Sequence, residues 1–166
     1  MKINYSAKIE GEVAKALGRD LPISKKHSVE ICRWLRKRKL DQAKNLLNRV
    51  LKKELVVPYK RHTWNLGHKR SAQGRPGRYP IKACKEILSL LEAVETNAQF
   101  KGMNTGNLII EHFNAHQSSR PWHFGRQRRR KMKRTHVEII VREGKKEKAE
   151  KPKKETKKET KGSEKK

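Results

Sequence analysis

The sequence predicts an α+β fold with a long β-hairpin that projects from a small domain. Apolar residues recur at helical spacing through most of the first 100 residues, and two strand-like segments follow at residues 108–115 and 135–141. A basic stretch without acidic residues separates these two segments. The chain has 166 residues, which suits one ordinary domain with a tail.

The N-terminal part holds a short strand candidate and a first helix candidate. Residues 3–9 form a mixed segment, INYSAKI, that is typical of a strand. Ile9, Val13 and Leu17 then recur at helical spacing, and Gly18 suits the left-handed position that ends a helix. We therefore expect a helix that stops at Gly18.

Two further helices are expected before residue 56. Ser24 suits the N-cap position of the first, in which Val29, Cys32 and Leu35 share one face. The second should end near Leu55, because a proline at position 58 disfavours helical backbone in the residue before it. Its apolar stripe consists of Ala43, Leu46, Leu47, Val50 and Leu51.

The longest predicted helix begins at Pro80, which fits the first helical position, and Gly102 is its expected C-terminal cap. Its apolar stripe consists of Ile81, Cys84, Ile87, Leu88, Leu91, Val94 and Ala98.

Residues 56–79 have no sustained period, and their aromatic and basic side chains alternate. Loops beyond ~12–15 residues in compact domains are mostly functional or disordered, so we interpret this one as an RNA-contacting loop rather than an ordinary exposed one. The GRPG run at 74–77 matches the GxxG loop of KH domains weakly, since no KH-like helix pair flanks it. The candidate RNA-binding residues are Arg61, His62, Trp64, His68, Lys69, Arg70, Arg75 and Arg78.

The two strand-like segments predict an antiparallel hairpin over about residues 108–141. Leu108, Ile110 and His112 are expected on one face of its first strand. At ~3.3–3.4 Å per residue, ten residues each way reach over 30 Å, so part of the hairpin must project beyond the domain.

The middle of the hairpin has the composition of an RNA-binding arm. Trp122, His123 and Phe124 precede Gly125, and aromatic rings stack on unpaired bases while guanidinium groups bind phosphate. The alternative is a solvated charge run, but such runs are usually tails, and strands flank this one. The candidate RNA-binding residues are Arg120, Arg126, Arg128, Arg129, Arg130, Lys131, Lys133 and Arg134.

The charge balance favours a polyanionic partner. The formal net charge is +27, and 33 basic against 12 acidic residues remain when the last 22 residues are set aside. Contacts to phosphate release condensed counterions, so nucleic acid is the leading partner, with an anionic membrane surface second. Residues 144–166 are rich in Lys and Glu, without apolar residues to bury, and are expected to be a disordered tail.

No enzyme signature is present, and carboxylates for acid/base or magnesium chemistry are scarce. We expect no catalysis, cofactor or small-molecule substrate. Cys32 and Cys84 are isolated on apolar helix faces, so a buried thiol is favoured over a metal ligand. Two cysteines suit a reducing compartment, and we expect neither a signal peptide nor a membrane-spanning helix.

Several stretches resemble, in order and spacing, the large-subunit ribosomal protein family called L-twenty-two in bacteria and L-seventeen in eukaryotes, in its archaeal and eukaryotic branch. They cover about residues 5–143, and they read GRDLPISKKHSVEICRWLR, LDQAKNLLNRVL, VPYKRHTWNLGHK, GRYPIKACKEILSLLEAVETNA, LIIEHFNAH, FGR and THVEIIV.

The resemblance implies three helices packed on a small three-stranded antiparallel sheet, in a domain at residues 1–143. It implies a structural constituent of the large ribosomal subunit in the cytoplasm, which binds ribosomal RNA, contacts neighbouring ribosomal proteins and supports assembly. The hairpin would line the nascent-polypeptide tunnel, and Gln127–Arg134 would grip RNA. By position, the tunnel-lining tip would be Ser118, Ser119, Arg120, Pro121, Trp122, His123, Phe124, Gly125 and Arg126.

The chain departs from the family pattern at two places. Many relatives have glycine after the first helix, where this chain has Lys37, so the left-handed geometry of that turn is in question. Relatives often have a small residue shortly before the tip Gly-Arg, where this chain has Trp122 and His123. These bulky residues would narrow the tunnel or rotate the tip.

Two other functions compete with a ribosomal one. A general nucleic-acid-binding protein outside the ribosome would bind DNA and RNA alike with a steep salt dependence. An enzyme acting on RNA would lose its turnover when a single carboxylate is replaced. The strand-flanked basic hairpin beside an aromatic loop favours the ribosomal hypothesis, because a general charge neutraliser needs neither.

Overall fold

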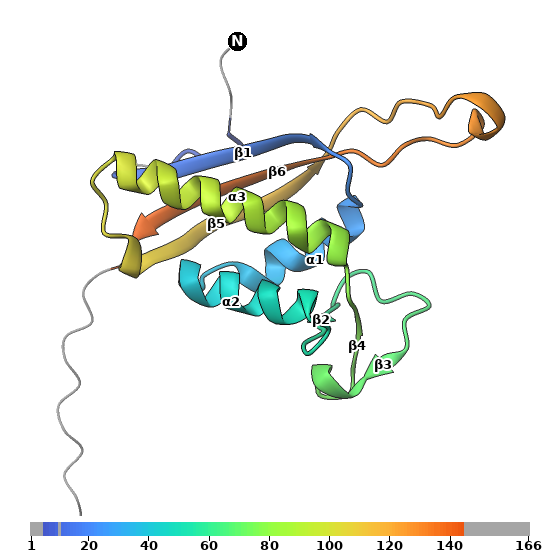
Figure 1. Ribbon diagram of the computed structural model, residues 1–166, viewed down its shortest axis with the longest axis horizontal. Helices are drawn as coiled ribbons and strands as arrows, with labels where there is room; N and C mark the ends of the chain where they lie inside the picture. The colour runs from blue at the N-terminus through green and yellow to red at the C-terminus, as the bar shows by residue number, and fades with distance from the viewer. Residues whose placement is uncertain (1–4, 10, 145–166) are drawn as a thin grey trace, which may run out of the picture.

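A computed structural model describes residues 5–9 and 11–144. The predicted tail therefore lies outside the described residues, apart from Gly144. Figure 1 shows the long helices on one side of a sheet, a long hairpin leaving the sheet at one end, and a small second sheet below that end. The predicted α+β class is confirmed, with its three helices, its three-stranded antiparallel sheet and its projecting hairpin.

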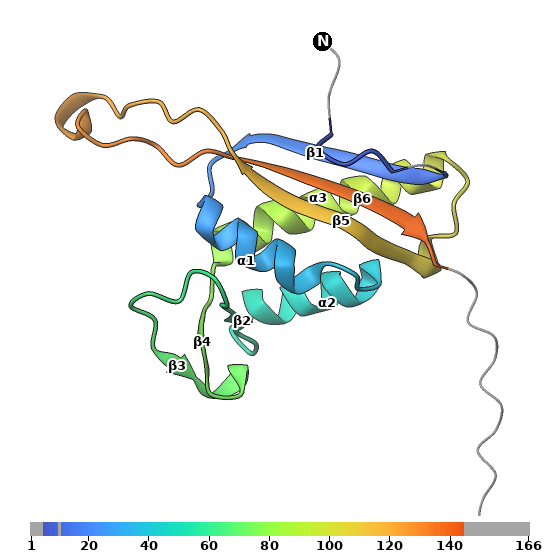
Figure 2. The same ribbon diagram turned by 180° about the vertical axis from the view of Figure 1, so that it is seen from behind.

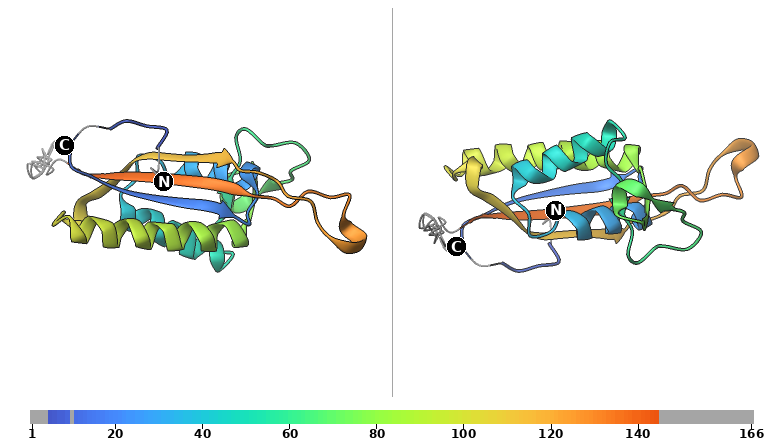
Figure 3. Two further views of the ribbon diagram at one scale, coloured as in Figure 1. Left: turned by 90° about the horizontal axis from the view of Figure 1, so that it is seen from above. Right: turned by 90° about the horizontal axis from the view of Figure 1, so that it is seen from below.

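The main sheet consists of β1 (Val13–Leu21), β6 (Thr135–Glu143) and β5 (Leu108–Gln117), in that spatial order. Both neighbours pair antiparallel with the central strand β6. Seen from behind, the sheet lies in front of the helices (Figure 2). Residues 5–9 lie on the face opposite α3 and cover part of that face (Figure 3).

The helix predicted before Gly18 is wrong, because this segment forms β1. Ala14 and Ala16 are buried in the core beneath the helices. A Cβ atom on Gly18 would lie 2.8 Å from a methyl group of Leu90 on α3 (Ile81–Phe100), so a larger residue here would require that leucine side chain to move. The expected strand at 3–9 is absent from its described part, residues 5–9.

The alternation expected along the first hairpin strand is wrong at its middle, because β5 contains a β-bulge. The register shifts between Ile110 and His112. Leu108 and Ile110 are buried before the shift, and Phe113 and Ala115 are buried after it. One extra residue therefore moves His112 to the opposite face from Leu108 and Ile110.

The three long helices confirm the predicted stripes, with local differences at their ends. The first, α1 (Lys25–Leu35), has Ser24 in its N-cap position, but the Ser24 side chain makes no capping hydrogen bond. The second, α2 (Leu40–Leu51), ends four residues before the predicted Leu55. Residues 52–55 wind into a terminal turn in which Lys53 has φ +62°. Helix α3 ends as predicted before Gly102, which has φ +71°.

The turn after α1 keeps its left-handed geometry although it carries a lysine. Lys37 has φ +65°, and its backbone N–H donates to the Ile110 carbonyl at 2.8 Å. The N–H of Ile110 in turn donates to the Arg38 carbonyl at 2.9 Å. These two bonds hold the turn against the bulged part of β5.

Residues 56–79 are not the structureless loop that the sequence predicts. They contain β2 (Val57–Pro58), β3 (His68–Lys69) and β4 (Arg75–Arg78), which form a second antiparallel sheet in the order β2-β4-β3. A Cβ atom on Gly77 would lie 2.8 Å from the Val57 carbonyl oxygen, so glycine is required where β4 meets β2. Residues 75–77 of the GRPG run thus belong to strand β4, and the run is not a KH-type loop.

Candidate RNA-binding surface

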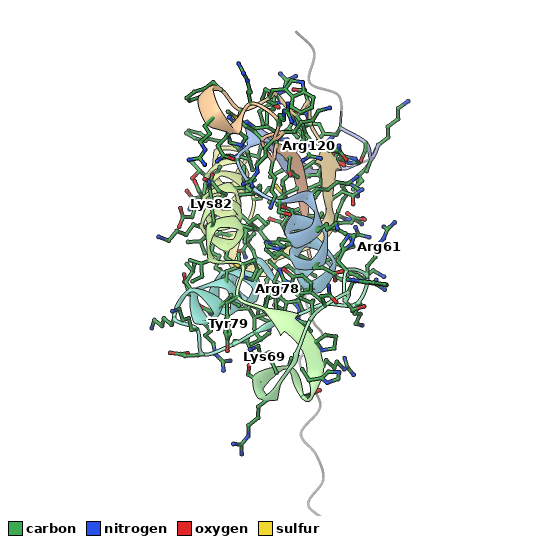
Figure 4. All side chains as sticks on the ribbon, turned by 90° about the vertical axis from the view of Figure 1, so that its right-hand side faces the viewer. Arg61, Lys69, Arg78, Tyr79, Lys82 and Arg120 are labelled. Atoms are coloured by element: carbon green, nitrogen blue, oxygen red, sulfur yellow. The ribbon has the colours of Figure 1, made fainter. Side chains whose placement is uncertain are left out.

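Four parts of the chain meet at one end of the molecule. The hairpin leaves the main sheet there, the second sheet lies below it, and α1 and α3 both begin there (Figure 1). Figure 4 looks onto this end and shows Arg120 on the hairpin and Lys82 at the start of α3. It also shows Arg61 and Arg78 on residues 56–79, which we call the second-sheet segment. We call these parts, residues 59–78, 118–134 and the first turns of α1 and α3, the basic end face.

The helix starts add to the positive potential of the basic end face. Neither α1 nor α3 has an acidic residue in its first turn. Lysines occupy these turns instead: Lys25 and Lys26 in α1, and Lys82 in α3. A helix N-terminus carries about half a positive charge, which normally favours acids. Both helix starts are therefore strongly positive, and their lysines are additional site candidates that sequence reasoning missed.

The second-sheet segment presents its candidate residues to solvent. The Trp64 side chain is 86% exposed, although its ring is large and apolar. His62 is half-buried, whereas the other basic candidates are exposed. These are Arg61, His68, Lys69, Arg70, Arg75 and Arg78.

A buried carboxylate holds this segment to the domain. Glu30 on α1 is 1% exposed, and its carboxylate accepts hydrogen bonds from three successive backbone N–H groups. The donors are Lys60 at 3.0 Å, Arg61 at 2.8 Å and His62 at 2.7 Å. The chain around Arg61 and His62 is thus fixed before any ligand arrives.

The base of the hairpin is fixed by residues that precede α1. The Ser118 hydroxyl donates to the Asp20 carboxylate, and the buried Thr135 hydroxyl donates to the Ile23 carbonyl at 2.9 Å. Ser118 is 7% exposed. The structure therefore places Ser118, the first residue of the expected tip, at the base of the hairpin.

Beyond the base, the hairpin arms are not the continuous strands that the sequence suggests. Residues 118–134 contain one isolated bridge, between Trp122 and Lys131, and a short 3-10 turn at Gly125–Gln127. The Lys131 ammonium lies 4.4 Å from the centroid of the Trp122 ring. The His123 N–H donates to the Arg130 carbonyl at 2.8 Å. These contacts keep the two arms together.

The outermost part of the hairpin is almost entirely exposed. Phe124 is 84% exposed and Trp122 59% exposed. The predicted candidates Arg126 and Arg128–Lys131 are all exposed and lie around the turn, whereas Arg120, Lys133 and Arg134 lie nearer the base. The structure thus divides the predicted arginine-rich run between the two ends of the hairpin.

The opposite face of the sheet has a different electrostatic character. Burial raises the pKa of Glu138, but hydrogen bonds outweigh it and bring that pKa to about 2. The donors are the Ser6 hydroxyl and N–H, with His112 at 2.8 Å and His116 at 3.0 Å from the Glu138 carboxylate. This cluster ties the N-terminal segment to the sheet and lies outside the basic end face.

The two cysteines are core residues. Cys32 and Cys84 are free thiols, 1% and 0% exposed, and burial raises the pKa of both, that of Cys84 to about 12. In residues 5–9 and 11–144, no group of three His, Cys, Asp or Glu side chains is placed to hold a metal ion. No helix of this described part is both long and apolar enough to cross a membrane.

The comparisons with known proteins agree on one family. A match to the family described as ribosomal protein L22p/L17e covers residues 16–142. The large ribosomal subunit protein uL22 of Methanococcus aeolicus is 41% identical over 149 residues, which are 86% of this chain and 97% of the relative. The protein of the same name from Thermoplasma acidophilum is 43% identical over 145 residues, covering 84% and 95% of the two chains.

A third relative, uL22 of Methanopyrus kandleri, is 45% identical over 139 residues, which are 78% of this chain and 86% of the relative. These archaeal proteins match the branch that the second-sheet segment and the GRDLPIS stretch indicate. The chain belongs to the ribosomal protein L22p/L17e family.

Proposed function

We propose that this protein is a structural constituent of the large ribosomal subunit in the cytoplasm and binds ribosomal RNA through its basic end face. The observation that carries the proposal is the convergence of two basic, acid-free segments and two helix N-termini at one end of the fold. The relatives are named large ribosomal subunit proteins, and their family consists of ribosomal structural proteins, not enzymes.

Two kinds of contact would hold the RNA. Exposed arginines such as Arg61 and Arg78 make bidentate contacts with phosphate, which position the protein on the RNA. Exposed rings such as Trp64 and Phe124 stack on RNA bases that are not paired in a double helix. Because phosphate and base contacts come from both the hairpin and the second-sheet segment, the protein would join RNA segments and so support subunit assembly.

The projecting hairpin suits a second role, as part of the wall of the nascent-polypeptide tunnel. Its outer residues are exposed and extend away from the domain that would bind RNA. Trp122 pairs with Lys131 across the two arms, so its ring is held in place instead of swinging freely. A fixed, bulky side chain at this place would set the width of the tunnel for the passing polypeptide.

Sedimentation of the protein with large ribosomal subunits through a high-salt gradient tests the ribosomal role. We expect the wild-type chain to remain bound, and Arg128→Ala/Arg129→Ala to be released at lower salt. The matched control is Lys8→Ala/Arg142→Ala, which removes two exposed cations outside the basic end face. Equal release of both variants, or equal affinity of the wild type for DNA and ribosomal RNA, contradicts the proposal and favours a general nucleic-acid-binding protein.

The tunnel role needs a variant that keeps the base of the hairpin. Replacing residues 122–131 with an Asn-Gly turn removes the outer hairpin and retains the contacts of Ser118 and Thr135. This variant also lacks Arg128 and Arg129, so we expect it to fold and to stay on large subunits only at low salt, through residues 59–78, the helix starts and the hairpin base. In such low-salt ribosomes, ribosome profiling or stalling-peptide assays should show altered passage of nascent chains. Unaltered passage in ribosomes that carry the variant would exclude the tunnel role.

A further inference from the structure

A hollow of about 470 Å³ lies where the hairpin base, the start of α1 and the second-sheet segment meet. Its volume suits a small ligand or one part of a larger one. None of its eight lining residues is acidic. The basic ones come from the start of α1, the second-sheet segment and both arms of the hairpin, and they are Lys25, Lys26, His62, Arg120, Lys133 and Arg134.

The walls of this hollow are held in place by the domain. Glu30 fixes the backbone at His62, and the Thr135 hydroxyl fixes the hairpin base beside Ile23. The Arg120 guanidinium donates to the Met132 carbonyl at 3.3 Å, which ties one arm of the hairpin to the other. A site whose walls are already ordered loses little conformational entropy when a ligand binds.

The positive charge around the hollow is not neutralised within the described residues that line it. Lys25 and Lys26 stand in the first turn of α1, where the helix dipole disfavours cations, and the Ser24 side chain caps no N–H group. Burial lowers the pKa of the adjacent His27, and the charges of Arg78, Lys133 and His62 lower it further. This arrangement costs stability in the free protein and is relieved when an anion enters.

We propose that this hollow binds a single phosphate group, supplied by the RNA backbone, and that this phosphate joins the hairpin to the body of the protein. The inference rests on the proposed RNA binding and gives Lys25 and Lys26 of the basic end face a specific ligand. Ammonium and guanidinium donors from three directions match the oxygens of one phosphate, and the free N–H groups of a helix start suit the same ligand.

The first test uses the full chain and inorganic phosphate. We expect the backbone amide signals of Lys25 and Lys26 in ¹H–¹⁵N spectra to shift and to saturate as the phosphate concentration rises. The ring signals of His62 should follow the same dependence on phosphate concentration. The variant Lys26→Gln/Lys133→Gln should lose this response, whereas Lys8→Gln, an exposed lysine outside the basic end face, should keep it. Shifts that are unsaturable, or equal in both variants, overturn the site.

The free proteins provide a control for folding. Removing crowded cations relieves repulsion, so Lys26→Gln/Lys133→Gln should unfold at the same temperature as the wild type or higher, although its phosphate response is lost. A lower unfolding temperature would show that these lysines support the fold instead, and would overturn the inference.

The second test measures affinity for a large-subunit ribosomal RNA transcript as a function of salt. Each single variant, Lys26→Gln or Lys133→Gln, should weaken binding about 10-fold, and the double variant by less than the product of the two, because both contact the same phosphate. For the same reason the salt slope should fall by about 0.9 in the double variant, not by twice that amount. Multiplicative losses overturn the single-phosphate site.

The outcomes separate this inference from the proposed function. If Arg128→Ala/Arg129→Ala weakens RNA binding while the hollow variants behave as Lys8→Gln does, the proposed function stands and the phosphate site is wrong. If inorganic phosphate shifts the Lys25 and Lys26 amide signals to saturation but the RNA transcript does not displace it, the ligand is free phosphate. The proposal that RNA supplies the phosphate is then wrong. If the wild type binds ribosomal RNA no better than unrelated RNA, the proposed function itself fails.

Discussion

Replacing Glu30 with Gln tests whether a buried carboxylate positions the RNA-binding segment. In the wild type, one carboxylate oxygen accepts from the Arg61 and His62 N–H groups and the other accepts from Lys60. Glutamine keeps one carbonyl oxygen but places an NH₂ group where the second oxygen was. The Lys60 N–H then faces a donor, and the two remaining hydrogen bonds lose their charge.

The magnitude follows from these three bonds. Hydrogen bonds to a charged group contribute about 1.5–3 kcal/mol each, against about 0.5–1.5 kcal/mol for neutral ones. Losing one such bond and weakening two would cost about 3.5–6 kcal/mol, but a buried neutral amide has a smaller desolvation penalty than a buried carboxylate, so the expected net loss is about 2–4 kcal/mol in the free energy of unfolding. In a domain of this size the loss corresponds to roughly 5–15 °C in unfolding temperature.

Urea unfolding and amide hydrogen exchange measure the effect of Glu30→Gln. We expect a lower midpoint and faster exchange at residues 60–62, together with weaker RNA binding, because the segment must then be ordered by the RNA. Glu54→Gln is the matched control, since its carboxylate is 55% exposed and lies 3.8 Å from Arg49. A loss for Glu30→Gln no larger than that of the control would mean that the Glu30 carboxylate does not hold residues 60–62 in place.

Three further predictions concern the rest of the fold. The pKa of Glu138 is lowered from 4.5 to about 2, so the free energy of unfolding of the wild type should fall as the pH drops from about 4.5 towards 2. The variant Glu138→Gln should lose this pH dependence, and parallel curves of unfolding free energy against pH for the two proteins would contradict the prediction. Cys32 and Cys84 should react with a thiol reagent only at the rate of unfolding, and a fast reaction in native buffer would show that they are accessible. The free energy of unfolding of Lys37→Gly should exceed that of Lys37→Ala by up to about 1 kcal/mol, because residue 37 has φ +65°, which strains a residue with a Cβ atom but not glycine. A glycine variant less stable than the alanine variant would count against strain at this turn.

The long helices and the hairpin could be predicted from sequence because their patterns are long. The stripe of α3 runs through 20 residues, and only a helix places all its apolar members on one face. The absence of acids in residues 55–85 and 113–136 likewise predicted both basic segments. Such signals depend on many residues, so one exception does not hide them.

The first strand was missed because a spacing of four residues is ambiguous. Val13 and Leu17 share a face in a helix, but they also share a face in a strand, where every second side chain points the same way. The inward residues of β1 are Ala14, Ala16 and Gly18, which are small because α3 passes close to them. Small residues give little periodic contrast, so the true alternation was hidden.

Other features depend on contacts that the sequence does not record. The bulge at Ile110–His112 inserts one residue, and nothing in the local sequence marks it. The strands of the second sheet have two to four residues, which is too short for a period. Glu30 bonds residues 30–32 positions away, so its role could be found only from the folded chain.

Cross-linking of the protein to RNA within intact large ribosomal subunits, read by mass spectrometry, identifies the surface that contacts RNA. We predict cross-linked peptides from residues 59–78 and 118–134 and from the first turn of α1, with few from the opposite sheet face around Lys15 and Arg142. Cross-links concentrated on that opposite face, with the basic end face unmodified, would contradict the account.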